Sequence, residues 1–296
     1  MDTLESIAGQ LDTTREIQSI VRVMKSLSAV SITQYETAVD ALGAYRDTID
    51  KGMQVVLQDF RIRQGHLPLR LFPDASGREG WIVIGSDRGL CGRFNETIAS
   101  FAQSRLDNHE ERPMLCVAGL RAAARLKTSG LDADKLFTLP GSVEGLIEIA
   151  QSILIEVERW RDHGGVHRVH VAYNRRGEQS RAAPRAIQIL PVSQEDLLRL
   201  ADAPWPGPSL PSFSMAPDAL LSWLVRQRMF LEVYEALAQS LASEHAARLA
   251  AMQAADRNIE ERREDIESLY RQKRQEAITR ELLDVVAGFE ASGGRS

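Results

Sequence analysis

The chain has 296 residues, 44% of them apolar, so it is long enough for two structural units and can build a buried core. Its formal net charge of −5 excludes the basic surface that drives nucleic-acid binding, and no nucleic acid is expected as a partner. Two cysteines, Cys91 and Cys116, are too few for a disulfide framework and favour a reducing compartment.

The N-terminus, MDTLESIAGQ, places acidic residues early and has no apolar run, so no signal peptide is expected. The longest apolar runs, residues 81–84 and 285–287, are far too short to span a bilayer. Membrane association is therefore expected only indirectly, through a partner.

Residues 1–60 are predicted to form the first helix of a coiled coil, because no Pro precedes Pro68 and apolar residues recur at heptad spacing. Within residues 26–31 the apolar residues expected at the seam, the face that meets the partner helix, are replaced by the small residues Ser28 and Ser31. This indicates either a close approach of a partner backbone or a weak coiled-coil segment. The two seams consist of Ile7, Val21, Tyr35, Leu42, Ile49 and Val56, and of Ile17, Met24, Ala38 and Tyr45.

A linker, residues 61–78, contains Pro68, Pro73 and Gly77, and the hydrophobic period then changes. Residues 79–200 alternate short apolar runs with amphipathic segments, which is typical of a Rossmann-like α/β domain with a largely parallel sheet. Asn95 is predicted to cap a helix that follows the first strand. The other predicted elements are strands at 81–84, 114–117, 169–173 and 187–189, and helices at 120–127 and 142–160.

Residues 201–217 form a Pro-rich second linker, and residues 218–290 are predicted to form the second long helix. No Pro or Gly occurs from Asp218 to Ala287, and the composition is dominated by strong helix formers. A helix of that length, on the order of 105 Å, cannot be buried against a compact core and needs a partner helix. His245, Arg248 and Arg262 interrupt its heptad seam.

The two long helices lie at opposite ends of the sequence, so they can pair antiparallel with the intervening domain at one end. This pairing places Met24 opposite Met252 and Leu4 near Gln272. The predicted fold class is α/β: a long antiparallel two-helix coiled coil, formed by the N- and C-terminal segments, with an inserted Rossmann-like α/β domain.

The most conspicuous short motif, residues 85–92 (GSDRGLCG), lies between the first predicted strand and a helix, where a doubly wound sheet places a phosphate loop. Its glycine spacing fits neither the dinucleotide fingerprint nor a P-loop, so a structural turn or a docking surface is favoured. Cys91 has no base nearby and is interpreted as a small buried residue. His167 and His170 are predicted on opposite strand faces, so no metal site is expected, and no catalytic residue or cofactor is predicted.

Three blocks then carry a resemblance to a known family. Residues 86–92 are close to TDRGLCGG, residues 242–252 are close to ASEQAARMVAM, and Arg274, Gln275, Ile278, Thr279, Glu281, Asp284 and Gly288 match a C-terminal signature. In this order, between two long helices, they resemble the gamma subunit of F-type rotary ATP synthases over essentially the whole chain. The resemblance implies a non-catalytic central stalk that transmits torque between a membrane ion-driven ring and the catalytic hexamer.

The resemblance also implies partners and site residues. The partners are the alpha and beta subunits of the hexamer, the epsilon subunit and the ring of c subunits. Arg274, Gln275 and Thr279 match positions that meet the beta-subunit catch loop. Met24 matches a helix methionine important for coupling, with Arg248 and Met252 as shaft residues near it. The loop residues expected to dock are Asp87, Arg88 and Gly89.

The resemblance and the register together predict a free tip of the shaft, residues 273–287. Its apolar side chains, Ile278, Leu282, Val285 and Val286, are too apolar to face water together. We therefore expect an apolar sleeve of surrounding subunits around them.

The sequence departs from the family at three places. Residues 31–34 (SITQ) replace a basic Lys-Met-Arg-Lys run, Ser214 replaces an acidic residue, and Phe289 replaces a small one. Because of these changes, the sequence does not establish whether the family's coupling and ring contacts are kept. The changes indicate a divergent branch of the family, and a sodium-translocating type is one interpretation. The lack of a transit peptide favours a bacterial protein on the cytoplasmic side of the cell membrane.

Two other functions remain as alternatives. The first is a Rossmann-like nucleotide-binding enzyme that dimerises through its coiled coil, which a nucleotide retained on the purified chain would favour. The second is a coiled-coil scaffold protein, which stable complexes without any ATPase subunit would favour.

Overall fold

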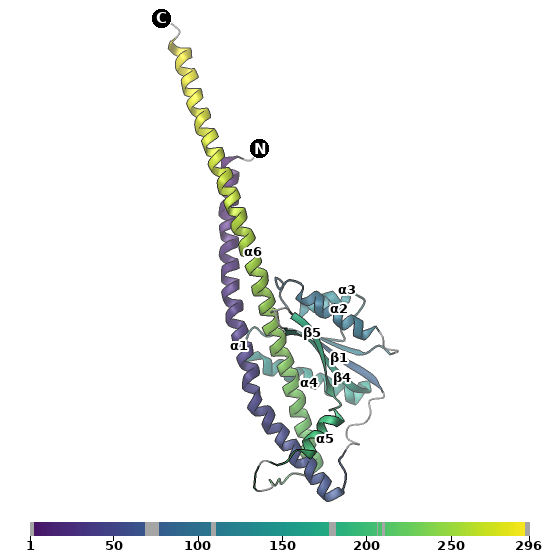
Figure 1. Cartoon of the computed structure of the whole chain (residues 1–296). Helices are drawn as coiled ribbons and strands as arrows, with labels where there is room; N and C mark the ends of the chain where they lie inside the picture. The colour runs from purple at the N-terminus through teal and green to yellow at the C-terminus, as the bar shows by residue number, and fades with distance from the viewer. Residues whose placement is uncertain are drawn as a thin grey trace. The chain divides into compact units, whose positions relative to one another are not determined.

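The computed structural model describes residues 3–68, 77–107, 111–177, 182–205, 207–208 and 211–293 (Figure 1). Residues 69–76 of the first predicted linker, including Pro73, lie outside the described residues, as does the side chain of Phe289. The elements in chain order are α1 (Leu4–Gln64), β1 (Arg78–Ile84), α2 (Phe94–Leu106), β2 (Met114–Ala118), α3 (Leu120–Thr128), β3 (Lys135–Phe137), α4 (Gly145–Gly164), β4 (Val166–Arg176), β5 (Ala182–Leu190), α5 (Gln194–Asp202) and α6 (Pro217–Gly293).

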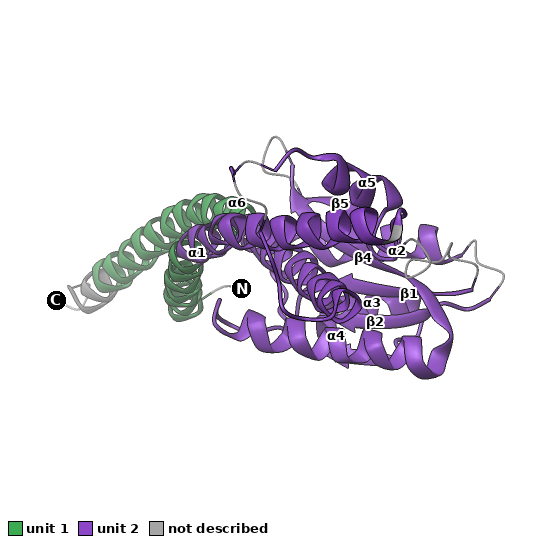
Figure 2. Ribbon diagram, turned by 90° about the horizontal axis from the view of Figure 1, so that it is seen from below, with its two compact units in different colours: residues 1–27, 249–296 green, residues 28–248 purple. Residues whose placement is uncertain are grey.

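The chain divides into two compact units (Figure 2). Unit 1 comprises residues 1–27 and 249–296, and unit 2 comprises residues 28–248. Each long helix contributes residues to both units. The two helices begin with the expected signals: Thr3 Oγ1 accepts a hydrogen bond from the backbone N–H of Ser6 (3.2 Å), and Pro217 occupies the first position of α6.

Unit 2 contains a five-stranded sheet in the order β3-β2-β1-β4-β5. The first four strands are parallel, and β5 pairs antiparallel with β4, with Val171 opposite Ile187. The predicted Rossmann-like α/β fold with a largely parallel sheet is therefore confirmed. Strand β1 lies at the centre and is almost entirely buried, which explains its continuous apolar sequence.

Both faces of this sheet are covered by helices within unit 2. On one face, Ile82, Cys116 and Val171 pack with residues of α4 and α6. On the other face, Trp81, Val83 and Leu115 pack with α2 and α3. A third cluster joins α1 to α5 and the start of α6, with Leu57, Leu197 and Leu221 at its centre.

The structure corrects several predicted elements. Strand β3 and helix α5 are not among the predicted elements: β3 is short and mostly exposed, and α5 lies in a stretch for which no element is predicted. Helix α4 begins at Gly145 rather than at Ser142. Asn95 does not cap α2, which starts at Phe94; its side chain instead bonds to Ser86.

Unit 1 contains the antiparallel pairing of α1 and α6. Gln18 Nε2 donates to Glu260 Oε2 (2.6 Å), and Lys25 Nζ forms an ion pair with Asp256 (2.6 Å). The predicted register would place Asn258 opposite Gln18 and Ala251 opposite Lys25, two and five residues from the observed partners, so it is shifted by up to about one and a half helical turns. Ile266 is the last buried residue of α6 among the side chains that the structure describes.

Candidate functional site

The candidate site is the loop of residues 85–92 and the segment of α6 against which it lies, both in unit 2. Where the chain leaves β1, the backbone of the loop lies close to the end of β2 and to α3. The N–H of Gly85 donates to the carbonyl of Ala118 (2.8 Å), and a Cβ at Gly85 would lie 2.1 Å from the Cβ of Ala122. Only glycine can therefore occupy position 85 without moving α3.

Asp87 ties the loop to two neighbouring segments. Its Oδ1 accepts a hydrogen bond from the N–H of Leu120 (2.8 Å), the first residue of α3. Its Oδ2 accepts one from the N–H of Leu139 (2.7 Å), beyond β3. A carboxylate at a helix N-terminus also interacts favourably with the helix dipole. Asp87 is thus a brace across the carboxyl ends of the strands, and its side chain is only partly exposed.

A second network is buried inside the loop. The Oδ1 of Asn95 accepts from the N–H of Ser86 (3.0 Å), and its Nδ2 donates to Ser86 Oγ (2.7 Å). Cys91 lies beside these groups, 2% exposed, and burial raises the pKa of its thiol. The expectation of a small buried residue at Cys91 is confirmed, because a raised thiol pKa disfavours the nucleophilic thiolate.

These contacts argue against a phosphate site in the loop. A phosphate loop needs backbone N–H groups that point at the ligand. Here the N–H groups of Gly85 and Ser86 are bonded to Ala118 and Asn95, and Asp87 places a carboxylate at the start of α3. Among the described residues, no group of His, Cys, Asp and Glu side chains could hold a metal ion.

Two loop side chains are directed to solvent. Arg88 is exposed, and Leu90 is 61% exposed. Leu90 has a φ of 64°, a left-handed conformation that costs a non-glycine residue free energy. Because the surrounding hydrogen bonds fix the loop, they hold an arginine and a leucine on its outer side.

Helix α6 holds the other side of the loop through Arg248. Its guanidinium is buried, forms an ion pair with the buried Glu244 one turn earlier, and donates from Nη2 to the carbonyl oxygen of Gly89 (3.3 Å). Its Nη1 lies 3.4 Å from Nδ1 of His245. The ring of His245 stacks on Tyr35 of α1, with 5.7 Å between the centroids. One cluster thus joins α1, α6 and the loop.

The pKa shifts in this cluster follow from burial and from the charges of Arg248, Arg88 and Glu244. Burial raises the pKa of Glu244, while Arg248 opposes that shift. Burial and the positive charges of Arg248 and Arg88 lower the pKa of His245 to about 4, so its imidazole is neutral at pH 7. Burial and the neighbouring Glu244 raise the pKa of Tyr35 to about 12. Arg248 therefore supplies the charge that Glu244 needs in order to stay ionised.

The other predicted site residues lie in unit 1. Met252 is buried and Met24 is half-buried. Arg274, Gln275 and Thr279 are exposed on α6, and Thr279 Oγ1 bonds back to the carbonyl of Gln275 (2.8 Å). The tip residues Ile278, Leu282, Val285 and Val286 are all exposed.

The structure therefore brings together only part of the predicted site. Asp87, Arg88 and Gly89 lie in the loop that meets Arg248, whereas the catch and tip residues lie farther along α6 in the other unit. The sequence predicts no role in this site for Glu244, and it predicts Asn95 only as a helix cap and Tyr35 only as a seam residue of the coiled coil. The available signal was the interruption of the heptad seam at His245 and Arg248, since charged or polar seam positions need a partner.

Comparison with known proteins identifies the family. The family model described as ATP synthase matches residues 3–291. The chain belongs to the ATP synthase gamma-chain family. It is 29% identical over 295 residues to the ATP synthase gamma chain of Anaeromyxobacter dehalogenans, covering 98% of this chain and 99% of that one. It is 24% identical over 297 residues to that of Buchnera aphidicola, with 98% and 99% covered.

The fold is likewise similar to solved central-stalk structures. The superposition on a chain of the Euglena gracilis mitochondrial ATP synthase, in its OSCP/F1/c-ring structure, gives a TM-score of 0.63 at 18% identity and covers 99% of this chain and 96% of that one. For the central stalk/c-ring structure from Tetrahymena thermophila, the TM-score is 0.56 at 18% identity, with 80% and 99% covered.

As a gamma chain, the protein is the central rotor stalk of a rotary ATP synthase and is a non-catalytic subunit. Its partners are the alpha/beta hexamer, the epsilon subunit and the c ring, and it belongs to the sector attached to the membrane. The predicted family, function and partners are confirmed, and nothing supports a nucleotide-binding enzyme or a scaffold. Among the described residues, no helix is long and apolar enough to cross a membrane.

Proposed function

We propose that the α/β domain of this gamma chain passes torque to the C-terminal helix through the contact of Arg248 with the loop of residues 85–92. The observation that carries the proposal is the buried Glu244–Arg248 pair, whose guanidinium reaches the carbonyl of Gly89. A buried, charge-assisted contact on a continuous helix resists sliding better than exposed surface pairs do.

Within this loop, one residue stabilises the loop conformation and others are proposed to contact a partner. Asp87 braces the loop, because both of its carboxylate oxygens accept backbone hydrogen bonds. Arg88 and Gly89 form the docking part: the exposed side chain of Arg88 can pair with a stator carboxylate, while the carbonyl of Gly89 is held by Arg248. An exposed cation makes a weak, salt-sensitive contact, which suits a surface that must release its partner in every turn.

Arg274, Gln275 and Thr279 are proposed to meet the catch loops of the beta subunits. Support comes from their exposure on one stretch of α6 and from their match to the family signature. Met24 and Met252 are proposed as coupling residues of the shaft in unit 1, where Asp256 lies one turn beyond Met252 and pairs with Lys25.

The tip is proposed to turn inside an apolar sleeve formed by the hexamer. Leu282, Val285 and Val286 are 61%, 67% and 48% exposed, which would be unfavourable if they remained in water. Apolar contacts have no fixed direction, so a smooth apolar sleeve allows rotation with few barriers. The bacterial membrane, on its cytoplasmic side, remains the proposed location, and the domain limits 79–200 and 218–290 remain proposals.

The experiment is reconstitution of the chain with alpha and beta subunits of a bacterial enzyme, followed by single-molecule rotation with a bead on the α/β domain. Wild-type chain should give ATP-driven rotation. Arg248→Ala should give hydrolysis with reduced torque or with slipping, and Arg199→Ala, which removes an exposed ion pair with Asp196 on α5, should behave as wild type. Unchanged torque in a folded Arg248→Ala shaft would refute the proposed path.

A further inference from the structure

The candidate site contains a histidine whose ring is held between two helices. His245 of α6 is half-buried, and its imidazole stacks on the ring of Tyr35 of α1 with 22° between the ring planes. Tyr35 is 2% exposed, so the close packing around it holds it in place. The stack fixes the plane of the imidazole, and Nδ1 of His245 lies 3.4 Å from Nη1 of Arg248. All three residues belong to unit 2.

This contact suits only one form of the imidazole. A guanidinium carries N–H donors and no acceptor, and it stays charged in folded proteins. Nδ1 of His245 therefore presents its lone pair to Arg248, and the ring proton is assigned to Nε2. A protonated ring would instead place a second cation, with an N–H on Nδ1, against the guanidinium. Burial and the charges of Arg248 and Arg88 lower the pKa of His245 to about 4, so the ring is neutral at pH 7.

The surrounding groups favour the same neutral form. The charges that act on the ring itself are those of Arg248 and Arg88, and both are positive. Glu244 is held by Arg248 in a buried ion pair, and Tyr35 stays a neutral phenol because burial and Glu244 raise its pKa to about 12. A positive surrounding disfavours an imidazolium, so His245 is kept as an acceptor. The charged and titratable groups of the cluster are Tyr234, Glu244 and Arg248 of α6, Tyr35 of α1, Asp87, Arg88 and Cys91 of the loop, and Glu144 just before α4.

The guanidinium of Arg248 needs a contact of this kind. Its ion pair with Glu244 and its hydrogen bond to the carbonyl oxygen of Gly89 both use the same nitrogen, Nη2. Contacts at a single nitrogen leave a planar guanidinium able to pivot about that nitrogen, whereas contacts at two nitrogens define its orientation. The contact of Nη1 with His245 provides the second point, so the direction of Nη2 is defined as well.

We propose that His245 is a positioning residue of the torque path: its Nδ1 accepts from Nη1 of Arg248 and thereby directs Nη2 at the carbonyl oxygen of Gly89. This inference rests on the proposed function, because the orientation of Arg248 matters for coupling only if torque passes through that contact. An amide oxygen can act as the same acceptor without titrating. Glutamine stands at this position in the block ASEQAARMVAM, which residues 242–252 resemble.

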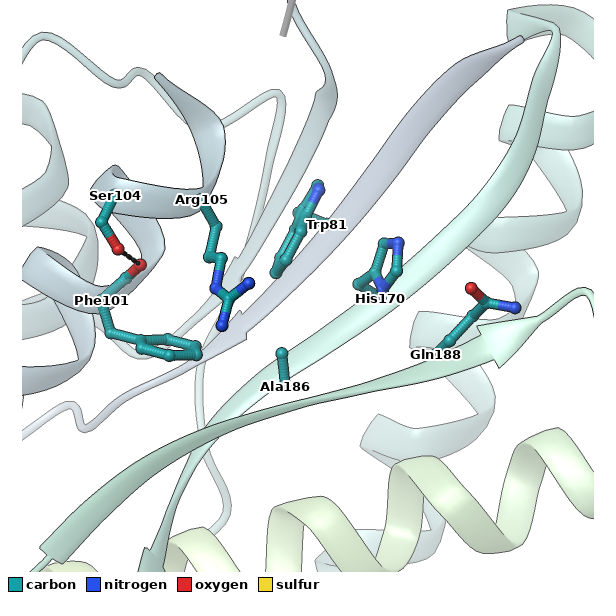
Figure 3. Close-up of a pocket in the computed structure, with 7 residues that line it drawn as sticks. All are labelled: Trp81, Phe101, Ser104, Arg105, His170, Ala186 and Gln188. Carbon is teal, nitrogen blue, oxygen red and sulfur yellow. Dashed lines mark hydrogen bonds between the residues drawn. The ribbon is translucent and has the colours of Figure 1, made fainter. Parts of the chain in front are cut away.

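A second histidine of unit 2 shows that stacking alone does not create this role. His170 of β4 stacks on Trp81 of β1, with 4.6 Å between the ring centroids (Figure 3). Its Nε2 lies 3.6 Å from Oε2 of Glu79. An ionised carboxylate only accepts hydrogen bonds, so this ring presents a donor to its neighbour, whereas His245 presents an acceptor. His170 is therefore a matched control, a stacked histidine of the same unit that faces a carboxylate instead of a guanidinium.

The first measurement is ATP-driven rotation of the chain reconstituted with alpha and beta subunits, with a bead on the α/β domain. His245→Phe keeps a ring on Tyr35 but removes the acceptor, so the shaft should slip or lose torque. His245→Gln keeps an acceptor and should turn as wild type does, and the control His170→Phe should keep full torque. Circular dichroism melting establishes that each variant is folded. Full torque in His245→Phe, or an equal loss in His245→Gln or in His170→Phe, overturns the positioning role.

The second measurement does not depend on the fold of the Phe variant. Nitrogen NMR spectra of the full wild-type chain, labelled at its histidines, should show an unprotonated Nδ1 and a protonated Nε2 for His245 at pH 7. The signals that are missing from His245→Gln identify this residue. A proton on Nδ1 would overturn the proposal. Arg248→Ala separates the two levels: full torque in that variant overturns the torque path itself, whereas slipping in Arg248→Ala with full torque in His245→Phe overturns only the role of His245.

Discussion

The guanidinium of Arg248 donates a hydrogen bond to the carbonyl oxygen of Gly89, 159 residues earlier in the sequence and 3.3 Å away. The same guanidinium neutralises Glu244, whose side chain is also buried. One side chain thus fastens a loop of the α/β domain to α6 and compensates a buried carboxylate. Because Arg248 has both roles, replacing it should lower the free energy of unfolding by a measurable amount.

Arg248→Ala should lower the free energy of unfolding by about 3–5 kcal/mol, because it leaves Glu244 buried without a counter-charge. All four tryptophans lie within residues 28–248, so their fluorescence in urea reports unfolding of unit 2. The control Arg199→Ala removes an exposed pair and should cost no more than about 1 kcal/mol. The double variant Glu244→Ala/Arg248→Ala should be more stable than Arg248→Ala alone. A double variant that is less stable would contradict the ion-pair argument.

His245 should make unit 2 less stable in mild acid. Its pKa is about 4 in the folded chain, below the ordinary value of 6.5, so between these values the unfolded chain binds more protons. This contribution to stability is complete above pH 6.5 and is lost as the pH falls toward 4. The raised pKa of Glu244 acts in the opposite sense, since acidification there favours the folded chain.

The expected loss from His245 is roughly 1 to 3 kcal/mol on going from pH 7 to pH 4. His245→Gln removes the titrating group and keeps a polar side chain, so unfolding free energies of the two proteins should converge in mild acid. The measurement is urea unfolding at a series of pH values. Parallel pH profiles for wild type and His245→Gln would show that the histidine does not titrate as described.

Two glycines of the loop should respond oppositely to the same change. Gly85→Ala places a Cβ 2.1 Å from the Cβ of Ala122 and should destabilise unit 2 by about 1–3 kcal/mol or more. Gly89→Ala meets no atom within 4 Å and should be close to neutral. Thermal melting of the two variants measures the difference. Similar melting temperatures would mean that α3 can shift away from β1 at little cost.

The long helices and the layered domain could be predicted from sequence because their signals are local and repeated. Heptad spacing predicts α1 and α6, short apolar runs predict β1 and β2, and the alternation of Val169, Val171 and Tyr173 predicts β4. The three-residue strand β3 could not be predicted, since only its pairing with Cys116 to Ala118 of β2 makes it a strand. Helix α5 had a usable signal, an acidic first turn followed by buried Leu197, Leu200 and Ala201.

The residues of the candidate site could be predicted from a sequence motif, but the contacts between them could not. The loop, Arg248 and the family resemblance could be taken from the sequence. The use of Asn95 within the loop could not, because its amide satisfies Ser86 nine residues earlier instead of starting a helix. The contact between Gly89 and Arg248 depends on how the sheet packs on α6, which no local pattern encodes.

Asp87 and Arg88 are neighbours in sequence, but substitutions at the two positions should have different effects on stability and on coupling. Asp87→Ala removes the acceptor of two backbone N–H groups and should lower the melting temperature of the purified chain by several degrees. Arg88→Ala removes an exposed side chain and should leave melting unchanged while weakening assembly or coupling of the complex. Melting curves and ATP-driven ion pumping distinguish the two. A large melting loss for Arg88→Ala with normal pumping would show that Arg88 is structural.

The tip of α6 should matter only inside the complex. Leu282, Val285 and Val286 are exposed in the chain, so changing all three to Ser removes no buried contact and should leave the melting temperature within about 1 °C of wild type. In the reconstituted enzyme the same triple variant should lower ATP-driven rotation torque, since the tip then loses its apolar fit to the sleeve. The control Glu281→Ser/Asp284→Ser changes charged residues in the same turns and should keep most of the torque.

If the control lost as much torque as the triple variant, charged rather than apolar side chains would hold the tip in the hexamer. If the triple variant turned with full torque, the tip would carry none of the load, and the shaft would be driven from the catch region of Arg274, Gln275 and Thr279 alone.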